Sequence, residues 1–369
     1  MTRIRDIANV LSASSALATD VETASAISTH ATAANGHISR GTTANRPVSA
    51  TIGDLYYDTT IDQMFNYSVS GWIQVGLIGK TQVTGGTLYS DSTYYYRVFT
   101  ANGTLATTGS STVDVQILVI AGGGGGGAWI AGGGGAGGVA YHSGKTLNAA
   151  SSYAITIGAG GVGALNSAND GLGSPYHLGF NGSDSYFDTI KAFGGGGGGG
   201  NGGATGNGSW NGSSGGSGGG ASQSRTPGTS SQTSNNGATG YGNSGGATSP
   251  YTNYTGSGGG GAGAVGGAIN GTTGGAGGAG LSTWSSWGLA TSTGQNVSGT
   301  VYYAGGGGGS GSGAQGAGGL GGGGTAGKPG IAGTANTGGG AGASDYPNDA
   351  PNGGSGIVIV RYLKTAVSA

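Results

Sequence analysis

Cysteine is absent from this 369-residue chain, so neither a disulfide framework nor a cysteine zinc site can exist. Charged residues make up only 7%, and Lys+Arg 12 against Asp+Glu 13 leaves a net charge of -1. No basic face for nucleic acid is therefore expected. No apolar run reaches the roughly 18 residues of a membrane span, and the opening MTRIRDIANVLSASS lacks the apolar core of a secretion signal. Proline occurs only 7 times and the glycines keep no strict three-residue period, which excludes collagen.

Glycine is what the chain has in excess, with 95 residues. Glycine-rich sequence is typical of flexible chains, because glycine loses the most entropy on folding and buries no side chain. Disordered chains are usually charged and poor in aromatic residues, however, and this one contains Tyr 18, Trp 5 and Phe 5. Composition therefore favours an ordered protein.

The first two zones of the chain are short. Residues 1–45 are rich in Ala, Ser and Thr, and their scattered apolar positions predict a helical segment with a thin seam. Such a seam suits association of several chains better than a monomeric amphipathic helix. Residues 46–80 predict a small β-meander with strands in GDLYYD, QMFNYS and WIQVG, which is too small to fold well alone.

Residues 81–369 predict a mainly β domain in which apolar strands run directly into glycine blocks. In the strand 113–120 the alternation of apolar and polar residues becomes fully apolar toward Gly122, so we expect its end to be buried on both faces. Further strands are expected in TLYS, TYYYRVFTA, TLATTG, VAYHSGKTL, SSYAITIGAGG, SYFDTIKAFGG, VYYAGGGGG and GGSGIVIVRYLK.

The glycine blocks predict a lattice of polyglycine II helices. These extended helices have three residues per turn and no internal hydrogen bonds, so their backbone groups can bond to neighbours in three directions. A helix enclosed on all sides needs unbroken glycine, as in 194–200, whereas an edge helix tolerates the mixed composition of 310–324. Because ordering glycine costs more than its hydrogen bonds return, a β-sandwich must hold the ends of the blocks.

The motifs ILVIAGGGGGG, GAGGVAYHSGKTL, YAITIGAGG and GGSGIVIVRY resemble the glycine-rich domain of bacteriophage tail-fibre and adhesin proteins, over about 85–363. This resemblance implies a β-sandwich continuous with a polyglycine II lattice, whose distal loops bind the host receptor. TRIRDIANVLS is similar to the start of phage virion proteins, ISTHATAANGHISR to trimeric fibre segments, and ANRPVSATIGDLYYDTTIDQMFNYSVSGWIQV to a small tail-protein module. The loops at 205–257 and 282–300 match no such motif.

Aromatic residues in the polar loops are the candidate receptor-binding residues. Exposed Trp and Tyr can stack on sugars or anchor protein contacts. The alternative is that they only cap the lattice and cover its flat glycine faces. The candidates are Trp129, Trp210, Tyr241, Tyr251, Tyr254, Trp284 and Trp287.

Catalytic and metal-binding constellations are weak. His30 and His37 could form a metal layer on a trimer axis, or simply pack as polar residues. Asp345 and Asp349 could pair as catalytic carboxylates, but SDYPNDAPNG is more simply a turn-rich loop. Matches to GxGxxG arise by chance in such sequence, and no helix follows them. We therefore expect neither an enzyme nor a cofactor.

The sequence thus predicts a phage tail fibre or receptor-binding adhesin located in the virion. Residues 1–45 would form the attachment and trimerisation segment, 46–80 the β-meander, and 81–369 the receptor-binding domain. The expected partners are copies of itself in a homotrimer, other phage tail proteins, and a host polysaccharide, lipopolysaccharide or outer-membrane protein. The alternative is a non-adhesive structural fibre, sheath or decoration protein. An ice-binding protein would need regular Thr or Ala faces, which are not seen.

Overall fold

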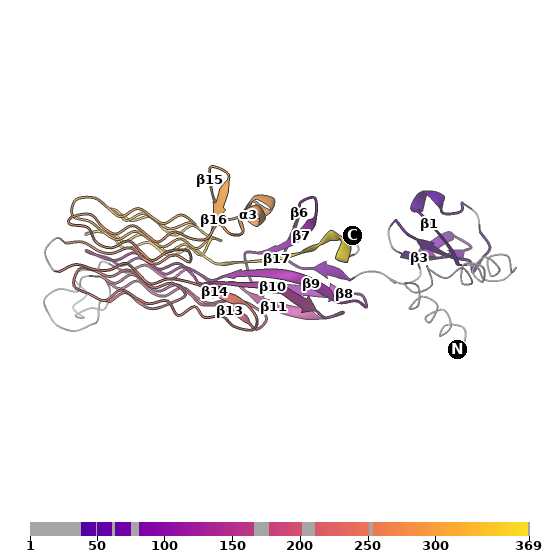
Figure 1. Cartoon of the computed structure of the whole chain (residues 1–369), viewed down its shortest axis with the longest axis horizontal. Coiled ribbons are helices and arrows are strands. Elements are labelled where there is room, and N and C mark those ends of the chain that lie inside the picture. The colour runs from indigo at the N-terminus through magenta and orange to yellow at the C-terminus, as the bar shows by residue number, and fades with distance from the viewer. Residues whose placement is uncertain are drawn as a thin grey trace. The chain divides into compact units, whose positions relative to one another are not determined.

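The computed structural model of the chain describes residues 38–48, 50–60, 63–74, 81–165, 177–200, 211–250 and 254–367. These residues form two compact units, one essentially of residues up to Gln82 and the other of residues from Val83 on. Both units are mainly β (Figure 1). Within these ranges, no helix has both the length and the apolar character to cross a membrane.

The first unit is a four-stranded sheet in the order β1-β2-β3-β4. Its strands are β1 (Ile38–Gly41), β2 (Leu55–Asp58), β3 (Gln63–Ser68) and β4 (Gly71–Gln74). The strands β2, β3 and β4 pair antiparallel, which confirms the predicted meander, while β1 pairs parallel to β2.

The end of the expected helical segment is not α-helical. Residues 38–41 form β1, and Thr43–Asn45 form the short 3-10 helix η2. The prediction of helix up to residue 45 is therefore wrong for this stretch, because pairing with β2 gives the backbone its hydrogen-bond partners. The rest of that prediction, residues 1–37, lies outside the described residues.

The second unit begins with two sheets that pack against each other. The six-stranded sheet has the order β14-β10-β9-β17-β7-β6 and the five-stranded sheet β13-β12-β11-β8-β5. The strand β12 lies against both β9 and β17 across the interface. The strands of both sheets are β5 (Gln82–Thr84), β6 (Thr87–Ser90), β7 (Tyr94–Phe99), β8 (Gly103–Thr108), β9 (Val113–Ile120), β10 (Val139–Leu147), β11 (Ser152–Thr156), β12 (Ser185–Phe187), β13 (Ile190–Ala192), β14 (Thr239–Tyr241) and β17 (Ile357–Leu363).

These strands confirm those expected from the apolar pattern, and within the two sheets only β5 and β14 were not expected. In β9 the alternating burial gives way to four consecutive buried residues at its C-terminal end, as predicted. After β17, the last element of the described residues is the 3-10 helix η3 (Lys364–Ala366).

The glycine segment 122–128 shows how the lattice is built. Its N–H groups donate in turn to three neighbouring segments, and the pattern repeats every third residue. Thus Gly122, Gly125 and Ala128 all donate to the segment 177–183. Its carbonyl groups accept from three other segments with the same period. The six neighbours are 132–138, 158–164, 177–183, 194–200, 338–344 and 350–356. This threefold periodicity is the hydrogen-bonding pattern of polyglycine II.

Close approach of backbones explains why the enclosed segments consist of glycine. A Cβ atom on Gly123 would lie 2.1 Å from the carbonyl oxygen of Gly339, and one on Gly133 would lie 2.1 Å from that of Gly307. No side chain fits at such distances. The segments 132–138 and 304–310 are likewise hydrogen-bonded on all sides, and the wavy parallel traces in Figure 1 show the lattice they form.

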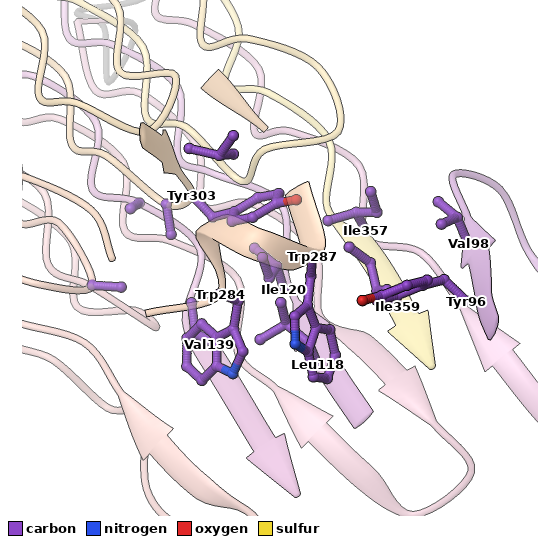
Figure 2. Packing of buried hydrophobic residues seen from close by; sticks show 14 residues of the cluster. Tyr96, Val98, Leu118, Ile120, Val139, Trp284, Trp287, Tyr303, Ile357 and Ile359 are labelled. Carbon is purple, nitrogen blue, oxygen red and sulfur yellow. The ribbon is translucent and has the colours of Figure 1, made fainter. Parts of the chain in front are cut away.

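A helix and a hairpin cover the junction between the sandwich and the lattice. The helix α3 (Ser285–Thr291) and the strand β15 (Gln295–Val297) fall in the region 282–300, where only a loop was expected, whereas β16 (Thr300–Tyr302) is the strand expected in VYYAGGGGG. Figure 2 shows Trp284 and Trp287 directed into an apolar cluster with residues of the six-stranded sheet, and the two tryptophans are 4% and 2% exposed. These tryptophans therefore hold the junction together.

Candidate binding surface

The turns between outgoing and returning lattice segments gather at the end of the second unit farthest from its sandwich (Figure 1). Each glycine segment leaves the sandwich side, crosses the lattice and reverses at a turn, so turns distant in sequence become neighbours. We call these the distal turns. Those described by the structure are 129–130, 222–225, 270–273, 311–314, 328–330 and 345–349.

The first distal turn has an unusual backbone. Trp129 and Ile130 have φ values of +55° and +54°. Few residues other than glycine adopt this left-handed region, and a β-branched residue such as Ile130 is strained there. The Trp129 N–H donates to Ser344 O at 2.9 Å and the Ser344 N–H donates to Gly127 O at 3.0 Å, so the lattice holds the turn in place. Strain of this kind is often stored at functional sites.

Three aromatic rings meet at this turn. The Trp129 ring lies edge-on to His177, with centroids 5.6 Å apart, and is inclined at 48° to Tyr346, with centroids 6.1 Å apart. Trp129 is 39% exposed and Tyr346 57% exposed. Burial lowers the pKa of His177, which favours the neutral imidazole. The three rings form one partly exposed aromatic cluster made by segments far apart in the sequence.

A polar group borders this aromatic cluster. Asp345 precedes Tyr346, and its carboxylate oxygen Oδ2 accepts a hydrogen bond from Gln315 Nε2 at 2.8 Å. Lys328 Nζ lies 3.8 Å from the same oxygen. The Asp345 side chain is 14% exposed and that of Lys328 63% exposed. The cluster therefore has a positioned acceptor and a flexible cationic donor beside its rings, and their charges balance.

A second group of distal residues lies around the turn 222–225. Gln223 Oε1 accepts a hydrogen bond from the Tyr254 N–H at 2.8 Å, and Thr248 Oγ1 donates to Arg225 O at 2.8 Å. Tyr254 is 56% exposed and has φ +51°. Its ring is thus presented to solvent from another left-handed position.

Small buried residues pack between the lattice segments next to the distal turns. Ala128, Ala164 and Ala350 form one buried cluster, and Ala131, Ala326 and Ala343 form another. Ser310 Oγ accepts a hydrogen bond from the Ala131 N–H at 2.6 Å. At the distal ends of the glycine segments, the methyl groups of these alanines and the Ser310 hydroxyl fill the space between neighbouring segments. They fix the backbone next to the exposed rings.

The structure brings only some of the sequence-predicted residues to this surface. Trp129 and Tyr254 lie at the distal end, whereas Tyr241 belongs to β14 and packs edge-on against Trp284. Trp284 and Trp287 are buried in the core, so the expectation that they are exposed for receptor contact is wrong. The reason is that α3 turns both rings onto the six-stranded sheet. The remaining candidates, Trp210, Tyr251, His30 and His37, lie outside the described residues.

Sequence reasoning missed Tyr346, Gln315 and Lys328 as members of this surface, and considered Asp345 only for catalysis. A signal was present in SDYPNDAPNG, a turn-rich stretch directly after the last outgoing glycine segment. Among the described residues, no group of three or more His, Asp or Glu side chains is arranged to hold a metal ion.

Comparison with known proteins places the chain in a family. The glycine-rich domain family matches residues 100–363, and the chain belongs to this family. No curated protein matches the chain. The match covers the whole lattice and the strands of both sheets from β8 on, and it bears out the glycine-rich domain that the sequence motifs indicated.

Proposed function

We propose that the protein is a receptor-binding adhesin of a phage tail fibre, with the distal turns as its contact surface. The observation that carries this proposal is the partly exposed aromatic cluster of Trp129, His177 and Tyr346 on a strained turn. Large exposed rings on a rigid scaffold are typical of binding surfaces, because little conformational entropy is lost on contact.

The lattice supports this function by its rigidity. Each enclosed glycine segment is hydrogen-bonded on all sides, so the distal turns are held in register without a large apolar core beneath them. A scaffold of this kind permits loops of many sequences, since its enclosed segments consist of glycine and contribute no side chains to the distal turns. The proposal includes assembly of the chain as a homotrimer, attachment to other tail proteins through the N-terminal residues, and a location in the virion.

The test is binding of the labelled full-length chain to a panel of bacterial strains, with two insertion variants. A flexible eight-residue epitope is inserted after Asn348 in a distal turn, or after Gly299 in the β15–β16 hairpin. Gly299 has φ +86° and no atom within 4 Å of a Cβ position, so this turn has room for an insertion. We expect the distal insertion to abolish binding and the hairpin insertion to leave it unchanged.

Equal binding by both variants would contradict a distal contact surface. If the chain binds no strain of the panel, the alternative is favoured, in which the protein is a non-adhesive structural fibre, sheath or decoration protein. Circular dichroism and thermal unfolding of both variants show whether the lattice is intact.

A further inference from the structure

The chemistry of the aromatic cluster and its polar border indicates the class of ligand. We propose that the distal turns bind an uncharged glycan, with a pyranose ring on the faces of Trp129 and Tyr346 and its hydroxyl groups bonded to Asp345 and Lys328. This inference rests on the proposed receptor-binding function and specifies its ligand.

The two exposed rings provide the apolar part of the site. The rings lie against each other with centroids 6.1 Å apart, and Trp129 is 39% and Tyr346 57% exposed, so one ligand can contact both. The face of an aromatic ring is electronegative and attracts the weakly positive C–H groups on one side of a pyranose. The His177 and Trp129 rings pack in a T-shaped arrangement, which restricts the orientation of the indole.

The polar border supplies the hydrogen bonds that a sugar requires. Carboxylates accept charge-assisted hydrogen bonds from hydroxyl groups, and an ammonium group donates to hydroxyl oxygens. Gln315 holds one oxygen of the Asp345 carboxylate, which orients the group before any ligand arrives. Because the charges of Asp345 and Lys328 balance, the border suits a neutral sugar better than an anionic polysaccharide.

The neighbouring distal turns favour a glycan over a protein. The turns 270–273 and 311–314 consist of Asn, Gly, Thr, Ser and Ala, which present polar groups and very small side chains. Protein interfaces are centred on a desolvated core of large side chains. A hydroxyl-rich ligand matches this polar, small-residue surrounding more closely.

The experiment measures binding of the labelled full-length chain to printed bacterial surface glycans and to intact cells of the strains that supplied them. Trp129→Asn removes the indole and keeps a residue that tolerates positive φ. Tyr346→Leu removes the second ring, and Asp345→Asn removes the carboxylate charge at nearly constant shape. The matched control is Phe180→Leu, because Phe180 is an aromatic residue 66% exposed on the same lattice segment as His177 and forms no part of the aromatic cluster. Unfolding temperatures of all variants separate loss of the site from loss of the fold.

We expect the chain to bind at least one neutral glycan, and each distal variant to weaken this binding about tenfold or more, which corresponds to roughly 1.4 kcal/mol. Phe180→Leu should bind as the unmodified chain does. Periodate oxidation of the cell-surface glycans should abolish cell binding, whereas protease treatment should not.

Two results would overturn the inference while leaving the proposed function in place. One is cell binding that protease removes and periodate does not, which would identify a protein receptor. The other is glycan binding that persists in the Trp129→Asn and Tyr346→Leu variants. Failure of the chain to bind cells of any strain would instead contradict the proposed function itself.

Discussion

A single methyl group inside the lattice tests whether close backbone packing dictates the glycine content. Gly124 lies in the middle of the segment 122–128, and a Cβ atom there would be 2.1 Å from the carbonyl oxygen of Gly196. Real Cβ atoms essentially never approach closer than 3.0 Å, so Gly124→Ala must push the two segments apart by about 0.9 Å.

The displacement has a calculable cost. The N–H groups of Gly195 and Gly198 donate to Gly122 O and Gly125 O at 2.9 Å, and separation would stretch both bonds to about 3.8 Å, beyond hydrogen-bonding range. Each broken buried bond costs about 1–3 kcal/mol. Replacing glycine by alanine returns roughly 0.4–1 kcal/mol through the unfolded state. We therefore expect Gly124→Ala to destabilise the protein by about 2–5 kcal/mol.

The neighbouring segment cannot simply move away, because it is held on its far side. The N–H groups of Gly196 and Gly199 donate to Ser217 O and Gly220 O. At about 2–4 °C per kcal/mol, the substitution should lower the Tm by about 4–20 °C in a thermal unfolding experiment.

The matched control is Gly144→Ala, at a glycine of β10 that has no atom within 4 Å of its Cβ position and no positive φ. It should change the Tm little or raise it slightly. Equal Tm values for Gly124→Ala and the unmodified chain would refute the reasoning, because the lattice would then tolerate a side chain where its geometry leaves no room.

Three further predictions concern the junction, the sandwich and the first distal turn. Trp287→Ala should destabilise the protein by about 3–5 kcal/mol in chemical denaturation, whereas Leu289→Ala on the same helix, at a side chain 50% exposed, should have little effect. Partial burial raises the pKa of Asp91, but hydrogen bonds from the Tyr96 hydroxyl and from backbone N–H groups outweigh this and lower it below 3.8. Its contribution to stability is therefore present above pH 4 and lost as the pH falls through the lowered pKa, and Asp91→Asn should flatten this acid limb in a Tm series from pH 5 to pH 2. Ile130→Gly should raise the free energy of unfolding by about 1 kcal/mol, because glycine adopts φ +54° without strain, and an unchanged or lower value would show that the turn stores no strain.

The strands were predictable because apolar side chains mark them. In β9 and β17 the pattern of Val and Ile gave both the strand and its burial. The helix α3 was missed because it is short, contains Gly288 and has no side-chain cap at Trp284. The spacing of Trp284 and Trp287 was nevertheless a signal, since residues three apart share one face of a helix.

The distal surface could not be predicted because its assembly depends on the order of the glycine segments. Trp129 meets Tyr346 only because the segments 122–128 and 338–344 are neighbours in the lattice. In a sheet, side chains specify which strands pair and in which register. A run of glycine has no side chains, so its neighbours are fixed by the sandwich strands that precede and follow it, and these connections cannot be read from the blocks themselves.

This dependence on the sandwich separates the source of stability from the distal turns within the second unit. The sandwich and the aromatic junction at Trp287 contribute the apolar burial, while the lattice contributes hydrogen bonds that no surface side chain can weaken. We therefore expect a change in a distal turn to alter the turn and to leave the interior of the lattice unaffected. The unfavourable backbone at Trp129 and Ile130 follows from the same arrangement, because the surrounding hydrogen bonds hold the turn whatever its side chains prefer. A scaffold with a side-chain core would have to repack for each new loop, and the glycine lattice does not.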